Sequence, residues 1–137
     1  MAKNTVLTLK KKVDEGGKVT MVTSYDYTMA ALVEEAGIDM ILVGDSLSMT
    51  MMGYDSTIPV TMDDMVHHTR CVTRATSNTF VVGDMPFLSY EQDVATAVSN
   101  AGRLMKEGRC QAVKLEGGIE VCPQVKAMVE AGIPVVG

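Results

Sequence analysis

Short apolar runs alternate with longer amphipathic stretches along nearly the whole chain. The runs are rich in β-branched residues, which is typical of buried strands, and the stretches between them have the periodicity of helices that pack one face on a core. The pattern predicts five strands, at residues 19–24, 38–43, 79–82, 111–115 and 133–136. It predicts five helices, at residues 5–15, 28–36, 61–74, 90–107 and 119–130. The resulting order is (βα)₄β, preceded by one extra N-terminal helix.

Residues at the helix ends support two of these boundaries. Thr61 is followed by Asp63 and Asp64, which favours a helix start because carboxylates there face the positive end of the helix dipole. Asp26 and Thr28 are both candidate caps for the helix that follows the first strand. Glycines after several of the stretches mark where the helices stop.

The alternation of strands and helices predicts an α/β fold with a parallel sheet. Five such strands form either an open doubly wound sheet or part of a (βα)₈ barrel. The number of strands alone does not decide between these two architectures. The positions of the acidic residues do bear on the choice, because they indicate how the strand ends are arranged.

Three acidic residues, Asp45, Asp84 and Glu116, end three successive apolar runs. Parallel strands place their carboxyl ends on one side of the sheet, so side chains far apart in the sequence meet there. Crowded carboxylates repel one another unless a cation or protons intervene, so the pattern predicts a site for a hard metal ion. It favours the barrel, because consecutive barrel strands bring their ends around one rim, whereas an open sheet concentrates ligands at its switch point.

Composition narrows the class of protein. At 137 residues and 47% hydrophobic, the chain has the size of one domain and can bury a core, which excludes disorder. The net charge of -5 comes from scattered acidic residues and gives little support to nucleic-acid binding. No apolar run is long enough to span a bilayer, and residues 1–12 lack the apolar segment of a secretory signal. Three scattered cysteines suit a reducing compartment, so we expect a cytoplasmic protein without membrane or nucleic-acid partners.

Several segments resemble the ketopantoate hydroxymethyltransferase (3-methyl-2-oxobutanoate hydroxymethyltransferase) family. They lie in order over nearly the whole chain, at residues 23–27, 42–47, 53–61, 83–87 and 113–118. The resemblance implies a (βα)₈ TIM barrel of the phosphoenolpyruvate/pyruvate type, in which residues 1–137 form a single domain, the N-terminal part, with the C-terminal half absent. It implies transfer of a hydroxymethyl group from 5,10-methylenetetrahydrofolate to 3-methyl-2-oxobutanoate, which gives ketopantoate (2-dehydropantoate) for pantothenate and coenzyme A biosynthesis.

The resemblance also assigns roles to residues at the strand ends. Asp45, Asp84 and, through water, Glu116 are expected to hold Mg²⁺. Asp45, Ser46, Asp84 and Lys114 are expected to bind the 2-oxo acid. A 2-oxo acid chelates Mg²⁺ through its carbonyl and one carboxylate oxygen, and the metal then stabilises the enolate that forms when the C3 proton leaves. A single acidic residue would be better interpreted as a helix cap, but three that coincide with the family's motifs reverse that judgement.

Lys114 and Ser46 complete the expected site. Lys114 lies two residues before Glu116, so both side chains point to the same face of a strand, where a cation can neutralise developing negative charge. Ser46 lies just past a strand end, where its hydroxyl can donate a hydrogen bond to the substrate carboxylate. The simpler alternatives are a salt bridge between Lys114 and Glu116, and a turn-capping role for Ser46.

The chain departs from the family in two respects. The family usually has glycine where this chain has Ser48, which is tolerated if the backbone φ is negative there and crowds the loop if it is not. The family's chain is about twice as long, and its proton-abstracting glutamate lies in the second half. We therefore expect no catalytic base among these residues, and slow or absent turnover by the isolated chain. The family further implies assembly into a homo-oligomer, a decamer.

Two other functions stay open. A related Mg²⁺-dependent 2-oxo acid lyase or mutase would share the barrel, although the segments at residues 25–27 and 55–61 favour the hydroxymethyltransferase. A half-barrel without a base could instead be a non-catalytic binding or assembly module. His67 and His68 have no second ligand at metal spacing, so surface or packing roles are expected, and Tyr25 either reaches the mouth of the site or belongs to a turn.

Overall fold

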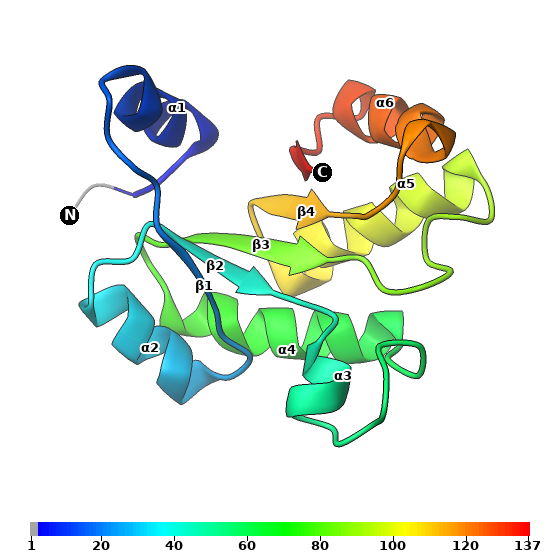
Figure 1. The fold of residues 1–137 in the computed structure, drawn as a ribbon, viewed down its shortest axis with the longest axis horizontal. Helices are drawn as coiled ribbons and strands as arrows, with labels where there is room; N and C mark the ends of the chain where they lie inside the picture. Colours follow the sequence, from blue (N-terminus) through cyan, green and yellow to red (C-terminus); the bar gives the residue numbers. More distant parts are fainter. Residues whose placement is uncertain (1–2) are drawn as a thin grey trace.

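The computed structural model describes residues 3–137 and contains one parallel sheet of five strands (Figure 1). The strands are β1 (Met21–Thr23), β2 (Met40–Val43), β3 (Phe80–Asp84), β4 (Ala112–Lys114) and β5 (Val135–Val136). The α-helices are α1 (Val6–Asp14), α2 (Tyr27–Glu35), α3 (Leu47–Thr50), α4 (Met62–Ala75), α5 (Val94–Arg103) and α6 (Cys122–Glu130). A π-helical turn, η1 (Leu104–Gly108), continues α5, and a 3₁₀ turn, η2 (Ile119–Val121), precedes α6.

The strands lie in their chain order, β1-β2-β3-β4-β5, and every neighbouring pair is parallel. An open doubly wound sheet reverses its strand order at a switch point, and this sheet has no such reversal among the described residues. Sequential parallel strands joined by helices are the arrangement of a (βα)₈ barrel. The strand order therefore confirms the architecture that the acidic residues favoured, a (βα)₄β portion with α1 as the extra helix.

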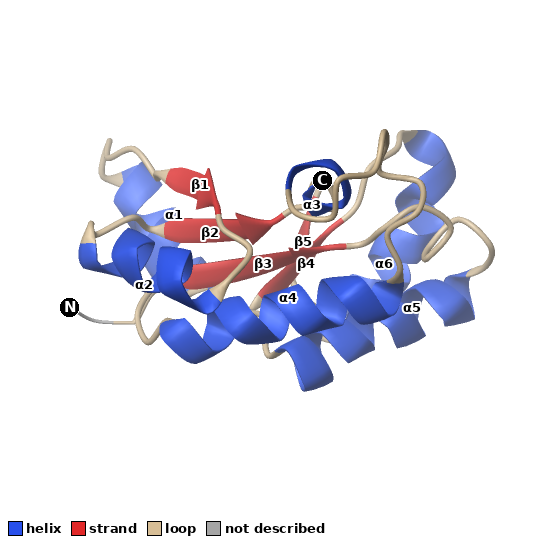
Figure 2. Ribbon diagram, turned by 90° about the horizontal axis from the view of Figure 1, so that it is seen from below, coloured by secondary structure: helices blue, strands red, loops and turns tan. Residues whose placement is uncertain are grey.

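Helices α2, α4, α5 and α6 form a layer on one face of the sheet, in which each helix lies beside the next (Figure 2). Alternate strand residues point into this layer, and Ile41, Val43, Val81 and Val113 are fully buried there. The residues between them belong to a second apolar cluster on the opposite face. Because both faces of the central strands are covered, these strands have continuous apolar sequences rather than alternating ones.

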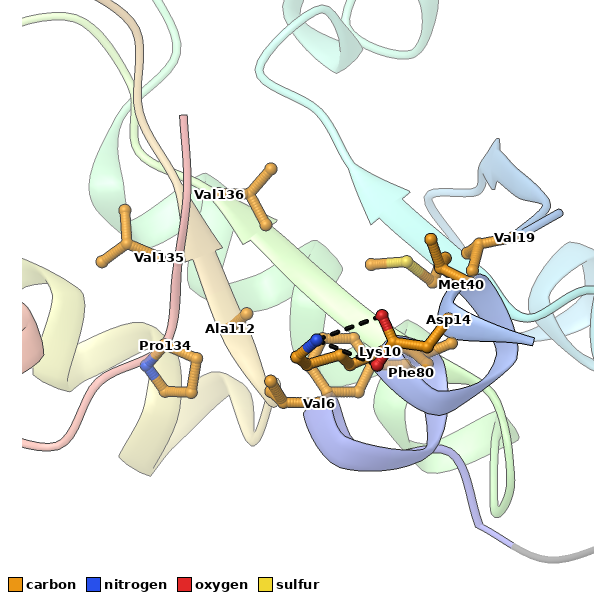
Figure 3. Close-up of a pocket in the computed structure, with 12 residues that line it drawn as sticks. Val6, Lys10, Asp14, Val19, Met40, Phe80, Ala112, Pro134, Val135 and Val136 are labelled. Atoms are coloured by element: carbon orange, nitrogen blue, oxygen red, sulfur yellow. Dashed lines mark hydrogen bonds and ion pairs between the residues drawn. The ribbon is translucent and has the colours of Figure 1, made fainter. Parts of the chain in front are cut away.

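The opposite face of the sheet packs on α1, whose Leu9 forms a cluster with Phe80 and other apolar residues of β3 and β4. A cavity of about 420 Å³ lies between α1 and the amino ends of the strands (Figure 3). Its lining is apolar except for the exposed ion pair of Lys10 and Asp14, whose Nζ and Oδ2 atoms are 2.9 Å apart. The lining of this cavity corresponds to a barrel interior at the amino ends of the strands, whereas the predicted site residues lie at the other end.

The structure corrects several predicted boundaries. The helix predicted at residues 90–107 begins at Val94, because the Asp93 carboxylate accepts a hydrogen bond from the Thr96 N–H at 2.7 Å and caps it there. Its last turn is the π-helical η1, which ends at Arg109 in the left-handed conformation with φ 65°. The short helix α3 is not indicated by the sequence pattern, and β1 and β5 are shorter than predicted.

Both predicted helix starts are capped. The Thr61 hydroxyl accepts from the Asp64 N–H at 3.2 Å, and the Asp64 carboxylate accepts from the Thr61 N–H at 2.9 Å, which forms a capping box at the start of α4. Asp26, rather than Thr28, caps α2 by accepting from the Met29 N–H at 2.9 Å. These caps fix where the connections after β1 and β2 end.

Candidate functional site

Three strand ends bring the predicted residues to one rim. Asp84 is the last residue of β3 and lies opposite Lys114, the last residue of β4, in the parallel register. Asp45 lies just beyond β2, and Glu116 lies just beyond β4. Asp84 is 3% exposed, Asp45 and Lys114 are half-buried, and Glu116 is exposed. The rim is therefore a polar site with one deeply buried carboxylate.

Asp84 is the centre of a hydrogen-bond network. Its Oδ1 and Oδ2 atoms accept from Lys114 Nζ at 3.0 and 3.2 Å, and Oδ2 also accepts from the Asp45 N–H at 3.1 Å. Lys114 Nζ donates in addition to Glu116 Oε1 at 2.9 Å. The expectation that Lys114 and Glu116 share a face is confirmed, and their ion pair is one part of a network that spans three strand ends.

Burial and charge have opposite effects on the ionisation of this network. Burial raises the pKa of Asp84 and that of Asp45, against the opposing effect of the Lys114 ammonium group on both. Burial alone would lower the pKa of Lys114, but its contacts with Glu116 and Asp84 raise it. The hydrogen bond from Lys114 lowers the pKa of Glu116. Lys114 is thus firmly charged. A further positive charge near the two aspartates would stabilise their ionised forms.

A cavity of about 250 Å³ opens in front of the carboxylates, and Asp45, Asp84 and Glu116 all line it. The other lining residues come from the connections that follow β2 and β3: Thr57, Ile58, Met85, Phe87, Tyr90 and Glu91. This volume suits a small acid rather than a drug-sized ligand. The sequence pattern misses Tyr90 and Glu91 because it places them inside a helix, and the capping potential of Asp93 is the signal that would have moved them into a loop.

Ser46 is connected to the neighbouring strand end by side chains. Its Oγ lies 3.1 Å from the Tyr25 hydroxyl, and it makes no capping hydrogen bond to α3. The backbone carbonyl of Tyr25 lies 2.7 Å from Nδ1 of His68, while the rings of His67 and His68 pack edge to face. Tyr25 therefore contacts the predicted substrate-binding residue Ser46, although neither residue lines the cavity. The two histidines have packing and hydrogen-bonding roles, as expected.

Ser48, at the position where the family usually has glycine, is accommodated without strain. It lies within α3 and is not among the described residues with positive φ. Its side chain is fully buried, and its hydroxyl donates a hydrogen bond to the Ser56 carbonyl at 2.7 Å. The hydroxyl thereby ties α3 to the loop that carries Thr57 and Ile58 to the cavity.

The oxygen donors at the rim suit a hard divalent ion such as Mg²⁺. Asp45 and Asp84 line the same cavity, whereas Glu116 lies farther out with the Lys114 ammonium group between it and Asp84. Within residues 3–137 no three His, Cys, Asp or Glu side chains lie close enough to hold an ion by themselves. The donor set is therefore chemically suitable, and the three-residue Mg²⁺ site stays a prediction.

Solved structures define the class of fold to which this sheet and its helices belong. The chain is similar to phosphoenolpyruvate phosphomutase from Streptomyces platensis subsp. rosaceus, with a TM-score of 0.73 and 18% identity, over 93% of this chain and 50% of that one. It is also similar to 2,3-dimethylmalate lyase, a PEP mutase/isocitrate lyase superfamily member, with a TM-score of 0.67 and 15% identity, over 95% of this chain and 50% of that one. At these identities the likeness establishes the fold, that of one half of such a barrel.

The family itself follows from sequence. The family model for ketopantoate hydroxymethyltransferase matches residues 3–137, and the chain belongs to this family. It is 58% identical over 133 residues to the 3-methyl-2-oxobutanoate hydroxymethyltransferase of Enterococcus faecalis, which covers 97% of this chain and 48% of that protein. The protein of the same name from Desulfotalea psychrophila is 62% identical over 122 residues, 89% of this chain and 44% of that protein. The chain thus spans about half the length of the curated relatives it matches.

Proposed function

We propose that this chain provides the metal-binding and oxo-acid-binding part of an enzyme that transfers a hydroxymethyl group from 5,10-methylenetetrahydrofolate to 3-methyl-2-oxobutanoate. The product would be ketopantoate, for pantothenate and coenzyme A biosynthesis. Family membership supports this reaction. The observation that carries the proposal is the buried Asp84 carboxylate, which is bound by Lys114 and by the Asp45 backbone at a cavity lined by three further carboxylates, those of Asp45, Glu91 and Glu116.

In this proposal Asp45 and Asp84 hold Mg²⁺ directly, and Glu116 does so through water. When bound, the ion acts as a Lewis acid on the 2-oxo group and acidifies the C3 proton. Burial raises the pKa values of both aspartates and so disfavours their ionised forms, and a bound cation would offset this effect. The two aspartates are therefore suitable metal ligands. The fold itself is compatible with Mg²⁺ and a small acid, since phosphonopyruvate hydrolase, at 14% identity and a TM-score of 0.73, has been solved in complex with oxalate and Mg²⁺.

Lys114 and Ser46 bind the 2-oxo acid in this proposal. The carboxylates around Lys114 keep it charged, so it opposes the negative charge that develops on the substrate oxygen as the C3 proton leaves. Ser46 and Tyr25 share one hydrogen bond between their hydroxyls at 3.1 Å, which uses one of the two protons. When Tyr25 donates in that pair, the hydroxyl proton of Ser46 is free for the substrate carboxylate.

We place the proton-removing base outside this set of residues. Asp45, Asp84 and, through water, Glu116 are assigned to the metal, and Lys114 is a charged donor, so these four residues are not available to accept the C3 proton. The family resemblance assigns the base to the half of the barrel that this chain does not match. The chain matches 48% of the Enterococcus faecalis relative. The base and the groups that bind the folate co-substrate belong, in this proposal, to the other half of the barrel.

A different reaction on the same fold has less support. The chain is 58% identical to a 3-methyl-2-oxobutanoate hydroxymethyltransferase, whereas it is 18% identical to the phosphomutase and 15% identical to the lyase. Identities as low as 18% and 15% establish a shared fold but not a shared reaction. We therefore retain hydroxymethyl transfer as the proposed reaction.

A role in assembly is favoured by one observation: all three residues of the edge strand β1 are exposed. Unpaired strand edges and open apolar faces recruit other chains. We propose that the chain associates with itself or with a complementary half-barrel, as a homo-oligomeric, cytoplasmic enzyme would. Within residues 3–137, no helix combines the length and hydrophobicity that a membrane span requires.

Calorimetry tests the proposed site. Titration of 3-methyl-2-oxobutanoate in the presence of Mg²⁺ should give weak binding that Asp84→Asn abolishes, because that change removes the buried charge at nearly constant volume. Asp14→Asn is the matched control, since Asp14 lies on α1 at the opposite end of the strands. Equal binding by the wild type and Asp84→Asn would remove this rim as the binding site.

A further inference from the structure

The connection between β3 and α5 is held in an unusual conformation beside the cavity. Leu88 has φ 61°, one of two described non-glycine residues with positive φ. This left-handed region is unfavourable for a branched side chain, so the surrounding contacts must hold the backbone there. The strained residue lies between Phe87 and Tyr90, both of which line the cavity. Such local strain is typical of segments that position a functional group.

Two amide side chains fasten the same segment to the helix layer. Asn100 Nδ2 of α5 donates to the Ser89 carbonyl at 2.7 Å. Gln124 Nε2 of α6 donates to the Tyr90 carbonyl at 3.3 Å, and this contact is fully buried. Because each bond holds the backbone at or next to Tyr90, the tyrosine ring projects from a fixed point rather than from a free loop.

The Tyr90 hydroxyl lies at the rim with its proton unused. Tyr90 is 6% exposed, and its phenolic oxygen accepts a hydrogen bond from the Glu116 N–H at 3.3 Å. Within residues 3–137 this oxygen donates to no protein group at hydrogen-bonding distance. A phenol that accepts one hydrogen bond still has one proton to donate. Tyr90 also lines the cavity, together with Asp45, Asp84 and Glu116.

We propose that the Tyr90 hydroxyl donates a hydrogen bond to an oxygen of the 2-oxo acid bound in this cavity. The ionised carboxylates of the lining are acceptors only, so an anionic substrate needs donors that face it. Tyr90 supplies one without adding charge, from the connection that follows β3. This inference rests on the proposed function and adds a substrate-binding residue to it.

The test compares Tyr90→Phe with Tyr27→Phe, which removes an exposed hydroxyl at the start of α2. Calorimetry with Mg²⁺ and 3-methyl-2-oxobutanoate should show unchanged affinity for Tyr27→Phe and affinity reduced by roughly tenfold or more for Tyr90→Phe, the usual effect of losing a hydrogen bond to a charged group. Equal affinity of the two variants would overturn the inference while leaving the proposed site intact. Failure of the wild type to bind would overturn the proposed function and this inference together.

A second measurement uses the wild-type chain, so it does not depend on whether a variant folds. The chain has four tyrosines and no tryptophan, so ring-labelled tyrosine gives a simple NMR spectrum. Addition of both ligands to the wild type should shift the Tyr90 ring resonance and leave that of Tyr27 in place. No shift of the Tyr90 resonance on binding would show that the ligand does not meet this side chain, and that result would overturn the proposal.

Discussion

Replacing Lys114 by methionine tests the charge network at the rim, because it removes the ammonium group and keeps a side chain of similar length. Asp84 would then retain one hydrogen bond, from the Asp45 N–H. Removing one partner of a buried ion pair costs about 3–5 kcal/mol. The Lys114 side chain is 21% exposed and that of Asp84 is 4% exposed, so we expect the free energy of unfolding to fall by an amount at the lower end, about 3 kcal/mol. The contact with Glu116 adds little, because the Glu116 side chain is 74% exposed.

Urea unfolding near neutral pH measures this loss. The double variant Asp84→Asn, Lys114→Met should be more stable than Lys114→Met alone, because the uncompensated charge is gone. The matched control is Lys10→Met, which breaks an exposed ion pair with Asp14 and should change the free energy of unfolding by less than about 1 kcal/mol. The reasoning is refuted if Lys114→Met is as stable as the wild type, or if the double variant shows no recovery.

The same variant should have a pH signature with a definite sign. Burial raises the pKa of Asp84, and loss of Lys114 should raise it further. A carboxyl group whose folded-state pKa exceeds its unfolded-state pKa binds protons more tightly when folded, so stability falls as the pH rises from the unfolded to the folded pKa. The loss in free energy of unfolding caused by Lys114→Met should therefore be small in acid and grow toward neutral pH. A loss in free energy of unfolding that does not depend on pH would instead indicate that the substitution acts by removing packing contacts.

Three further outcomes follow from the structure. Mg²⁺ binding should tighten as the pH rises through the raised pKa values of Asp45 and Asp84, because the ion competes with protons; affinity that falls with rising pH in calorimetry would contradict this. Leu9→Ala should lower the free energy of unfolding by about 2–3 kcal/mol, because Leu9 anchors α1 on the sheet, and urea unfolding should find a loss well above that of the exposed Leu7→Ala. Light scattering should show self-association, and a stable, cooperatively folding monomer at micromolar concentration would contradict the open-edge argument.

The sequence was informative where the signal is local or repetitive. The alternation of apolar runs with amphipathic stretches predicts all five strands, and the carboxylates that end three of them mark the rim that the structure forms. The spacing of Lys114 and Glu116 predicts that they share a face, because side chains alternate along a strand. Thr61 and Asp26 are recognisable as caps from their positions alone.

Contacts between distant segments could not be predicted in the same way. The bond between Lys114 and Asp84 depends on the register of β3 and β4, which no local pattern defines. The proximity of Tyr25 to Ser46 likewise depends on how two connections meet above the sheet. The sequence pattern predicts a helix from Tyr90 onward, whereas the cap at Asp93 makes the helix begin at Val94 and leaves Tyr90 in the connection that lines the cavity.

The central claim is that these residues carry the metal and oxo-acid part of the site and that the base lies elsewhere. The most direct test measures ketopantoate formation from 3-methyl-2-oxobutanoate and 5,10-methylenetetrahydrofolate by the 137-residue chain, alone and mixed with a polypeptide that spans the unmatched half of the Enterococcus faecalis relative. A positioned base typically contributes ~10²–10⁴-fold, so the account predicts little or no product from the chain alone. It predicts turnover in the mixture that Asp84→Asn and Lys114→Met each abolish. Turnover by the chain alone near that of the full-length relative, or turnover in the mixture that survives Asp84→Asn, would contradict the account.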